Sequence, residues 1–200
     1  MKLVDDMTIP VLGFAAFSGT GKTTLIEKLI LELNNRGVDV AVIKHDAHGL
    51  KFDRDGKDSQ RFVSAGAVMS WVNGPEVSAA FSGKSFSLED NIEMIRRTAD
   101  ITGVRLILVE GYKTGDIDKV GMCREATGKG FTADISEFVA VVTDCDISTC
   151  CTATVSSNSV GSTDHTDIIS TCGNAGATVA TFRFDEADKL ADWIIENYCR

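Results

Sequence analysis

A glycine-rich segment near the start of the chain has the residue types and spacing of a phosphate-binding loop. Residues 16–23 read Ala-Phe-Ser-Gly-Thr-Gly-Lys-Thr, between an apolar run and an amphipathic pattern. In such a loop, backbone N–H groups converge on phosphate oxygens, and the following helix adds the positive end of its dipole. Lys22 is then expected to reach the β- and γ-phosphates, and Thr23 to ligate Mg²⁺. The strict pattern begins with glycine, where this chain has Ala16, and the alternative is a glycine turn with a structural role.

A magnesium ion at this loop needs a carboxylate in addition to the threonine hydroxyl. Glu110 directly follows the apolar run 106–109, so we expect it at the carboxyl edge of a sheet, close to the loop. A carboxylate that ends a buried strand needs a partner. Asp58 follows the second expected strand and is another candidate, although a solvated helix cap also explains it. The sequence leaves both candidates open.

A Lys-His pair ends the second expected strand. Lys44 and His45 are candidates to contact phosphate or substrate, and a solvated strand edge is the alternative. His45 and His48 also suggest a metal site, but two histidines without a third nearby ligand are weak evidence for one. No residue is indicated as catalytic, because neither a water-positioning glutamine nor an internal arginine finger is evident, and this predicts slow hydrolysis.

Asp144 is the candidate for recognition of the base. The Asn-Lys-x-Asp element by which many GTPases bind guanine is absent, and Val142-Thr143-Asp144 ends a late strand where that element would fall. A carboxylate accepts hydrogen bonds from the ring N–H and exocyclic amine of guanine, which adenine does not offer in that arrangement. The alternative is an aspartate that forms a turn.

The elements expected around these residues alternate between strands and helices. Two short runs flank Asn-Gly-Pro at 73–75 and predict a β-hairpin over Val68–Val72 and Val77–Phe81. The whole pattern predicts an α/β fold, a three-layer, doubly wound, mostly parallel sheet of the phosphate-loop NTPase type with an inserted β-hairpin. Strands are expected at 11–17, 38–43, 106–109, 138–142, 152–155 and 178–182, and helices after the loop, at about 88–100 and at about 185–198.

Composition restricts the class of protein. Two hundred residues suffice for one α/β domain, so we expect a single phosphate-loop nucleotide-binding domain over 1–200. The formal charge of −9 opposes a broad footprint on DNA or RNA. No apolar stretch is long enough to span a bilayer and the first residues lack the features of a signal peptide, so a cytoplasmic location is expected.

The six cysteines form no Cys-x-x-Cys pair and favour reduced structural thiols, with a redox or sulfur-ligand role for Cys145, Cys150 and Cys151 as the alternative.

Together these motifs resemble the molybdopterin-guanine dinucleotide biosynthesis protein B (MobB) family. Ala16 is usual at the first loop position of this family, so the one mismatch to the strict pattern supports the resemblance. The segment 145–180 is longer and richer in cysteine than the family leads us to expect. The matching pieces keep their order and spacing over most of residues 9–145 and comprise residues 14–25, Ile43-Lys44-His45, Gly56-Lys57-Asp58-Ser59, Ser64-Ala65-Gly66-Ala67, residues 106–113 and Val141-Val142-Thr143-Asp144.

The resemblance implies a GTP-binding accessory protein with weak hydrolysis, which assists the enzyme that attaches GMP to molybdenum-bound molybdopterin. The implied cofactors are GTP and Mg²⁺, with Thr23 and either Asp58 or Glu110 as metal ligands. The implied partners are a molybdenum-cofactor guanylyltransferase, molybdopterin as a further candidate, and a second copy of the chain, with the hairpin near 68–81 helping to build the homodimer. Nucleotide contacts are expected from Ser18, Gly19, Thr20, Gly21, Lys22, Thr23, Thr24, Lys44, Thr143 and Asp144.

Two alternatives belong to other classes of protein. An ATP-dependent small-molecule kinase or ligase of the dethiobiotin-synthetase type also has a phosphate loop and a Glu-Gly at a strand end, and a preference for ATP over GTP would identify it. A nickel-metallochaperone GTPase would favour a histidine-rich tract, and this chain has only three histidines.

Overall fold

The structure is a computed structural model that describes residues 9–46, 58–112, 115–146 and 179–199. The chain forms two compact units, one of residues 1–45 and 92–200 and one of residues 46–91. We call them the sheet unit and the hairpin unit and describe each by itself. The expectation of a single nucleotide-binding domain over 1–200 stays a proposal.

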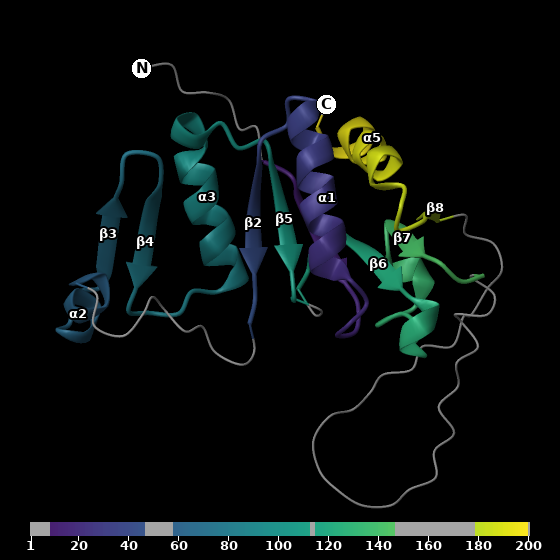
Figure 1. Ribbon diagram of the computed structural model, residues 1–200, viewed down its shortest axis with the longest axis horizontal. Helices are drawn as coiled ribbons and strands as arrows, with labels where there is room; N and C mark the ends of the chain where they lie inside the picture. Colours follow the sequence, from purple (N-terminus) through teal and green to yellow (C-terminus); the bar gives the residue numbers. More distant parts are fainter. Residues whose placement is uncertain (1–8, 47–57, 113–114, 147–178, 200) are drawn as a thin grey trace, which may run out of the picture. The chain divides into compact units, whose positions relative to one another are not determined.

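The sheet unit contains a six-stranded sheet in the order β2-β5-β1-β6-β7-β8 (Figure 1). Every neighbouring pair of strands in it is parallel, which confirms the expected doubly wound α/β fold. Because the strands are parallel, their carboxyl ends share one edge of the sheet, and β1 lies where the strand order reverses. The strands are β1 (Val11–Ala15), β2 (Val40–Lys44), β5 (Leu106–Glu110), β6 (Lys119–Cys123), β7 (Ala140–Thr143) and β8 (Ala180–Phe182).

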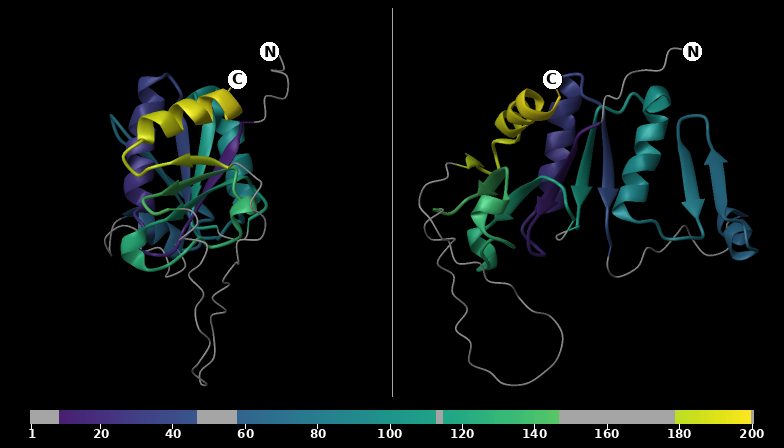
Figure 2. Two further views of the ribbon diagram at one scale, coloured as in Figure 1. Left: turned by 90° about the vertical axis from the view of Figure 1, so that its right-hand side faces the viewer. Right: turned by 180° about the vertical axis from the view of Figure 1, so that it is seen from behind.

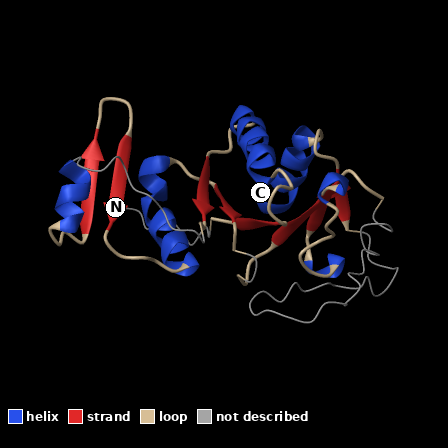
Figure 3. Ribbon diagram, turned by 60° about the horizontal axis from the view of Figure 1, so that its bottom comes forward, coloured by secondary structure: helices blue, strands red, loops and turns tan. Residues whose placement is uncertain are grey.

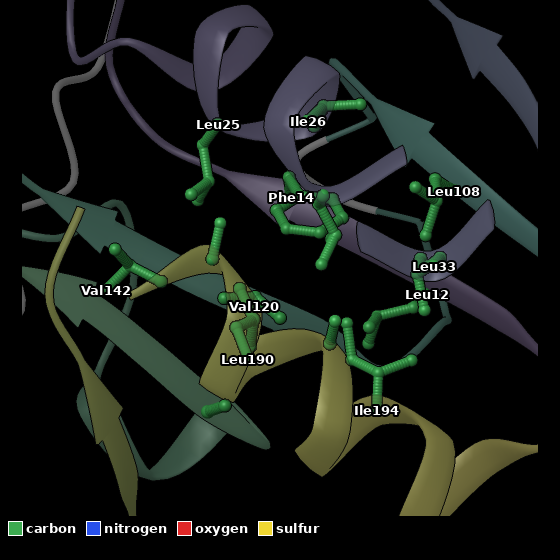
Figure 4. Close-up of a cluster of buried hydrophobic side chains, with 14 of the residues drawn as sticks. Leu12, Phe14, Leu25, Ile26, Leu33, Leu108, Val120, Val142, Leu190 and Ile194 are labelled. Atoms are coloured by element: carbon green, nitrogen blue, oxygen red, sulfur yellow. The ribbon is translucent and has the colours of Figure 1, made fainter. Parts of the chain in front are cut away.

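Two helices, α1 (Lys22–Asn35) and α5 (Ala187–Tyr198), cover one face of this sheet side by side (Figures 2 and 3). Both helices present apolar residues at helical spacing, as the sequence predicts. The core between helices and sheet is apolar and buried. Figure 4 shows its members converging from the two layers, among them Leu12, Phe14, Leu25, Ile26, Leu33, Val120, Val142, Leu190 and Ile194.

The opposite face of the sheet carries a smaller apolar cluster. Residues alternate between the two faces along each strand, so Phe14 points to the helices while its neighbour Ala15 joins the second cluster with Val141 and Phe138. Gly121 lies under the ring of Phe138, and a Cβ at this position would approach the ring to 2.5 Å. Glycine in β6 is therefore required by the packing of the second face.

The strand β6 has no counterpart among the expected strands. Its sequence, Lys-Val-Gly-Met-Cys, is short and interrupted by glycine, so its pattern is weak, although Val120 and Met122 are fully buried. The other described strands lie within a few residues of their expected positions. Helix α3 (Leu88–Thr102), expected at about 88–100, begins with a capping box, in which Asp90 N donates to Ser87 Oγ at 3.0 Å and Ser87 N to Asp90 Oδ2 at 3.1 Å. The expected strand at 152–155 lies outside the described residues.

The hairpin unit consists of α2 (Asp58–Ser64) and a two-stranded antiparallel sheet of β3 (Met69–Asn73) and β4 (Ser78–Ser82). This confirms the expected hairpin. Its turn closes with a hydrogen bond from Gly74 N to Val77 O at 2.8 Å. Several large apolar side chains of the unit are exposed, including Phe62 at 60%, Trp71 at 61% and Val77 at 74%.

The described helices are all too short or too polar to cross a bilayer. Cys123 and Cys199 are not disulfide-bonded, as expected, whereas Cys145 is disulfide-bonded, contrary to the expectation of reduced thiols. Burial raises the pKa of the Cys123 thiol, which keeps it protonated at neutral pH.

Candidate nucleotide site

The phosphate loop connects β1 to α1 at the carboxyl edge of the sheet. Gly19 and Gly21 adopt positive φ angles of 84° and 94°, a left-handed conformation that strains any residue with a side chain. The hydroxyl of Thr20 donates to Phe17 O at 2.9 Å and fixes the loop from inside. Helix α1 begins directly after Gly21 without a side-chain cap, so the N–H groups of its first turn are not occupied by a capping residue. This arrangement suits an anion.

Lys22 places its amine over the loop. Its Nζ donates to the carbonyl oxygens of Ala16 and Phe17, each at 3.1 Å. The ammonium group is thus folded back across the loop. A cation in this position stabilises bound phosphate by charge-assisted hydrogen bonds, as the sequence predicts.

Thr23 and Glu110 lie together at the site expected for the metal. Thr23 Oγ1 donates to Glu110 Oε1 at 3.1 Å and lies 3.4 Å from Oε2. Glu110 is only 9% exposed, and it ends β5 between Phe14 of β1 and Lys44 of β2. A hydroxyl beside a buried carboxylate is an oxygen donor set of the kind that Mg²⁺ takes in proteins. The described residues here therefore fit a magnesium ion.

Lys44 is the other charged neighbour of Glu110. Its Nζ lies 4.0 Å from Glu110 Oε2, and its side chain is 57% exposed. The pair is loose, so the lysine amine can contact both the carboxylate and a ligand at the edge. His45 N donates to Glu110 O at 2.9 Å, and the ring of His45 packs against Tyr112 at 4.9 Å between centroids. His45 is exposed, and because His48 lies outside the described residues, the metal site suggested by the two histidines stays a prediction.

The other end of the site is a cavity of about 420 Å³ beside the loop, in the size range of small-molecule pockets. We call it the base cavity. It lies between the end of the phosphate loop with the first two turns of α1 and the segments that follow β6, β7 and β8. Its lining combines three cations, two carboxylates and an aromatic ring. The lining residues are Gly21, Thr24, Leu25, Lys28, Arg124, Asp144, Arg183, Phe184 and Asp185.

Asp144 lies in this cavity with its carboxylate anchored. Asp144 Oδ1 accepts a hydrogen bond from Glu125 N at 2.8 Å, which ties the end of β7 to the segment after β6. The other carboxylate oxygen remains for a ligand with N–H groups. Thr143 is buried and does not line the cavity. Its hydroxyl lies 3.0 Å from Cys145 Sγ, so the guanine contact implied for Thr143 stays a prediction.

Two predicted residues are not brought to this edge by the described contacts. Asp58 belongs to the hairpin unit, where its exposed carboxylate pairs with Arg61 at 3.2 Å, so its role as a metal ligand stays a prediction. His48 lies outside the described residues. Within the ranges that the structure describes, no group of three histidine, cysteine or acidic residues is arranged to hold a metal ion.

Six lining residues of the base cavity were not predicted as site residues, namely Leu25, Lys28, Arg124, Arg183, Phe184 and Asp185. They lie just past a strand or within the first two turns of a helix. Arg124 was hidden because β6, which positions it, was not predicted. Knowledge of the strand order would have indicated the residues that follow β6 and β8. The carboxyl ends of these strands share an edge of the sheet with those of β1 and β7.

Comparison with known proteins identifies the family of the chain. A family model described as molybdopterin guanine dinucleotide synthesis protein B, MobB, matches residues 11–144. A molybdopterin-guanine dinucleotide biosynthesis adapter protein of Escherichia coli is 39% identical over 120 residues, which is 60% of this chain and 69% of the relative. The adapter protein of the same name from Haemophilus influenzae is 37% identical over 134 residues, 67% of this chain and 74% of the relative.

Solved structures show the same fold. A crystal structure of Bacillus subtilis MobB superposes with a TM-score of 0.60 at 18% identity, and covers 94% of this chain and 96% of that one. A crystal structure of molybdopterin-guanine biosynthesis protein B gives a TM-score of 0.58 at 21% identity, with 93% and 98% covered. The names of the relatives agree with the adapter hypothesis and give no support to the kinase or ligase alternative. The family resemblance found in the motifs is confirmed, and the chain belongs to the MobB family of molybdopterin guanine dinucleotide synthesis proteins.

Proposed function

We propose that this protein is a GTP-binding adapter in the formation of molybdopterin guanine dinucleotide. The observation that carries the proposal is the contact of Thr23 with the buried Glu110 at the phosphate loop, because it joins a phosphate site to a metal site. Family membership supplies the pathway. The protein binds the nucleotide and presents it to a molybdenum-cofactor guanylyltransferase, and is not itself that transferase.

In this proposal, GTP lies along the carboxyl edge of the sheet. Backbone groups of the loop and the amine of Lys22 hold the phosphates, with Lys44 at the margin. Thr23 and Glu110 hold Mg²⁺, which neutralises phosphate charge when bound. Asp144 accepts hydrogen bonds from the guanine ring N–H and amine. Hydrolysis is slow, since no described side chain at this edge is placed to orient a water at the γ-phosphate.

Titration calorimetry with GTP and ATP, each with and without Mg²⁺, tests the nucleotide. We expect tighter binding of GTP than of ATP and a gain in affinity from Mg²⁺. Tighter binding of ATP would contradict the guanine assignment and revive the kinase or ligase hypothesis.

Co-purification with a molybdenum-cofactor guanylyltransferase, in GTP-loaded, GDP-loaded and nucleotide-free states, tests the adapter role. We expect a complex in at least one of these states. Failure in all three would contradict the adapter role while leaving GTP binding intact.

The proposed homodimer uses the hairpin unit. Phe62, Trp71 and Val77 are each at least 60% exposed, and Phe62 and Trp71 line a groove of about 1160 Å³ on this unit. Exposed apolar area of this kind marks association surfaces, and a lone two-stranded sheet is marginally stable in water. Light scattering after chromatography should give twice the chain mass, and Trp71→Lys should give the monomer. A monomeric unsubstituted chain would contradict the dimer.

A further inference from the structure

Arg124 holds an unusual position between the phosphate loop and the base cavity. It follows β6 directly, and one guanidinium nitrogen lies against Gly21, 3.4 Å from where a Cβ of that glycine would be. The guanidinium carbon lies 3.9 Å from the ring centroid of Phe184. The side chain is thus sandwiched between the loop and an aromatic ring, and it lines the base cavity together with Asp144.

The backbone around Arg124 is fixed by hydrogen bonds. Arg124 O accepts from Thr127 N at 3.0 Å and from Thr127 Oγ1 at 2.7 Å. The next residue, Glu125, donates its N–H to Asp144 Oδ1. Arg124 and Asp144 are therefore held in one rigid frame, and their side chains enter the same cavity from adjacent strand ends.

The charge of Arg124 is not neutralised by the described part of the chain. Its Nε is buried without a hydrogen-bond partner there, and no described carboxylate forms an ion pair with it. A cation placed by packing on a ring, rather than by a carboxylate, keeps its donors for a ligand. A ligand of this cavity must therefore offer hydrogen-bond acceptors to the arginine as well as donors to the carboxylate.

We propose that Arg124 recognises the acceptor edge of guanine, donating hydrogen bonds to O6 and N7 while Asp144 accepts from the ring N–H and the exocyclic amine. This inference rests on the proposed function and deepens it by naming a second specificity residue. An arginine fork matches O6 and N7 of guanine, whereas adenine presents an amine in place of O6. The arginine thus contributes to the discrimination of guanine from adenine, in place of the asparagine of the absent Asn-Lys-x-Asp element.

The position of the cavity favours the base over a phosphate as the partner of Arg124. Lys22, Thr23 and Glu110, which form the phosphate and metal end, do not line the base cavity. The cavity adjoins the loop at Gly21 and extends along α1 past Thr24 as far as Lys28. A contact with the α-phosphate is the competing role. The two roles can be distinguished by measurement, because only a contact with the base makes the binding affinity depend on the atoms of the base.

Competition binding with GTP and 7-deaza-GTP tests the inference, because the analogue replaces N7 by C–H and leaves the phosphates unchanged. We expect the unsubstituted protein to bind 7-deaza-GTP about tenfold more weakly than GTP. In Arg124→Ala the ratio of the two affinities, GTP over 7-deaza-GTP, should fall to about one. In Arg124→Lys, which keeps a charge but not the planar guanidinium fork, the same ratio should also fall towards one. Arg183→Ala is the matched control, since it removes a cation from the same cavity and should leave the ratio unchanged.

The outcomes separate this inference from the function on which it rests. Equal affinity of the unsubstituted protein for GTP and 7-deaza-GTP overturns the role of Arg124 without need of a variant, while GTP binding itself stands. Loss of both nucleotides in equal measure in the Arg124 variants assigns the residue to the α-phosphate and also overturns the inference. Absence of any GTP binding by the unsubstituted protein overturns the proposed function, and the inference with it.

Discussion

The two ends of the candidate site are built in different ways. The phosphate end comes almost entirely from the continuous loop after β1, with Glu110 as its one distant member. The base cavity is assembled from α1 and from the ends of β6, β7 and β8, which are more than a hundred residues from the loop at their farthest. A continuous loop is fixed by local backbone geometry, whereas an assembled cavity depends on the packing of the whole sheet. From this difference we expect substitutions at the phosphate end to remove nucleotide binding, and substitutions in the base cavity to change only the selectivity for the base.

Removal of the lysine amine should have the largest effect. Lys22→Ala deletes the cation that lies over the loop and should lower affinity for GTP and ATP alike, on the order of a hundredfold or more. The circular dichroism spectrum should stay unchanged, because the helix and strand on either side keep their core residues. Calorimetry checks the prediction. Lys28→Ala, which removes a cation from the base cavity, is the control and should lower the affinity for GTP by a smaller factor. Micromolar binding retained by Lys22→Ala would show that the loop is not the site.

Removal of the Glu110 charge should weaken the effect of magnesium on GTP binding. Glu110→Gln keeps a hydrogen-bond acceptor for Thr23 but not the carboxylate, so the gain in GTP affinity from Mg²⁺ should drop by roughly tenfold. Affinity measured with a chelator present should not fall. Asp58→Asn gives the comparison for the second predicted ligand. If Asp58→Asn alone removes the dependence on Mg²⁺, the metal assignment moves to the hairpin unit.

A change at Asp144 should alter selectivity rather than abolish binding. Asp144→Asn keeps the oxygen that accepts from Glu125 N, but presents an amide N–H₂ where guanine also presents donors. GTP affinity should fall by about tenfold, and xanthosine triphosphate, which has a carbonyl in place of the amine, should bind more tightly than before. Competition assays with both nucleotides check this. An unchanged ratio of the two affinities would contradict the base contact.

The smallest effect is expected at Phe184. Phe184→Leu keeps apolar volume but removes the aromatic face under Arg124, and a cation–π contact of this kind contributes about 0.5–1 kcal/mol. GTP affinity should therefore fall by roughly two- to fivefold. Binding of inorganic triphosphate, which does not enter the base cavity, should remain as in the unsubstituted protein. A matching loss for triphosphate would show that the two ends of the site are not separable.

Much of the phosphate end was predictable from the sequence because its determinants are local. Gly19 and Gly21 are needed for two left-handed backbone conformations, and Lys22 and Thr23 follow them in a fixed register on α1. Glu110 was predictable for a related reason, since a carboxylate that ends a continuous apolar run must emerge at the edge of a sheet. The hairpin and the capping box of α3 were also visible, because each depends on a few adjacent residues.

The sequence by itself determined the loop, most of the described strands and helices, and the family, since all of these follow from residue types at short spacing. Only the tertiary structure decided that Glu110, rather than a residue of another strand, contacts Thr23, and that Arg124 and Phe184 join Asp144 in one cavity. The physical reason is that the order of strands in the sheet depends on how the apolar side chains of all strands are buried together, which no single segment of sequence shows. β6, whose weak pattern hides it, is buried between β1 and β7 and carries Arg124 to the loop.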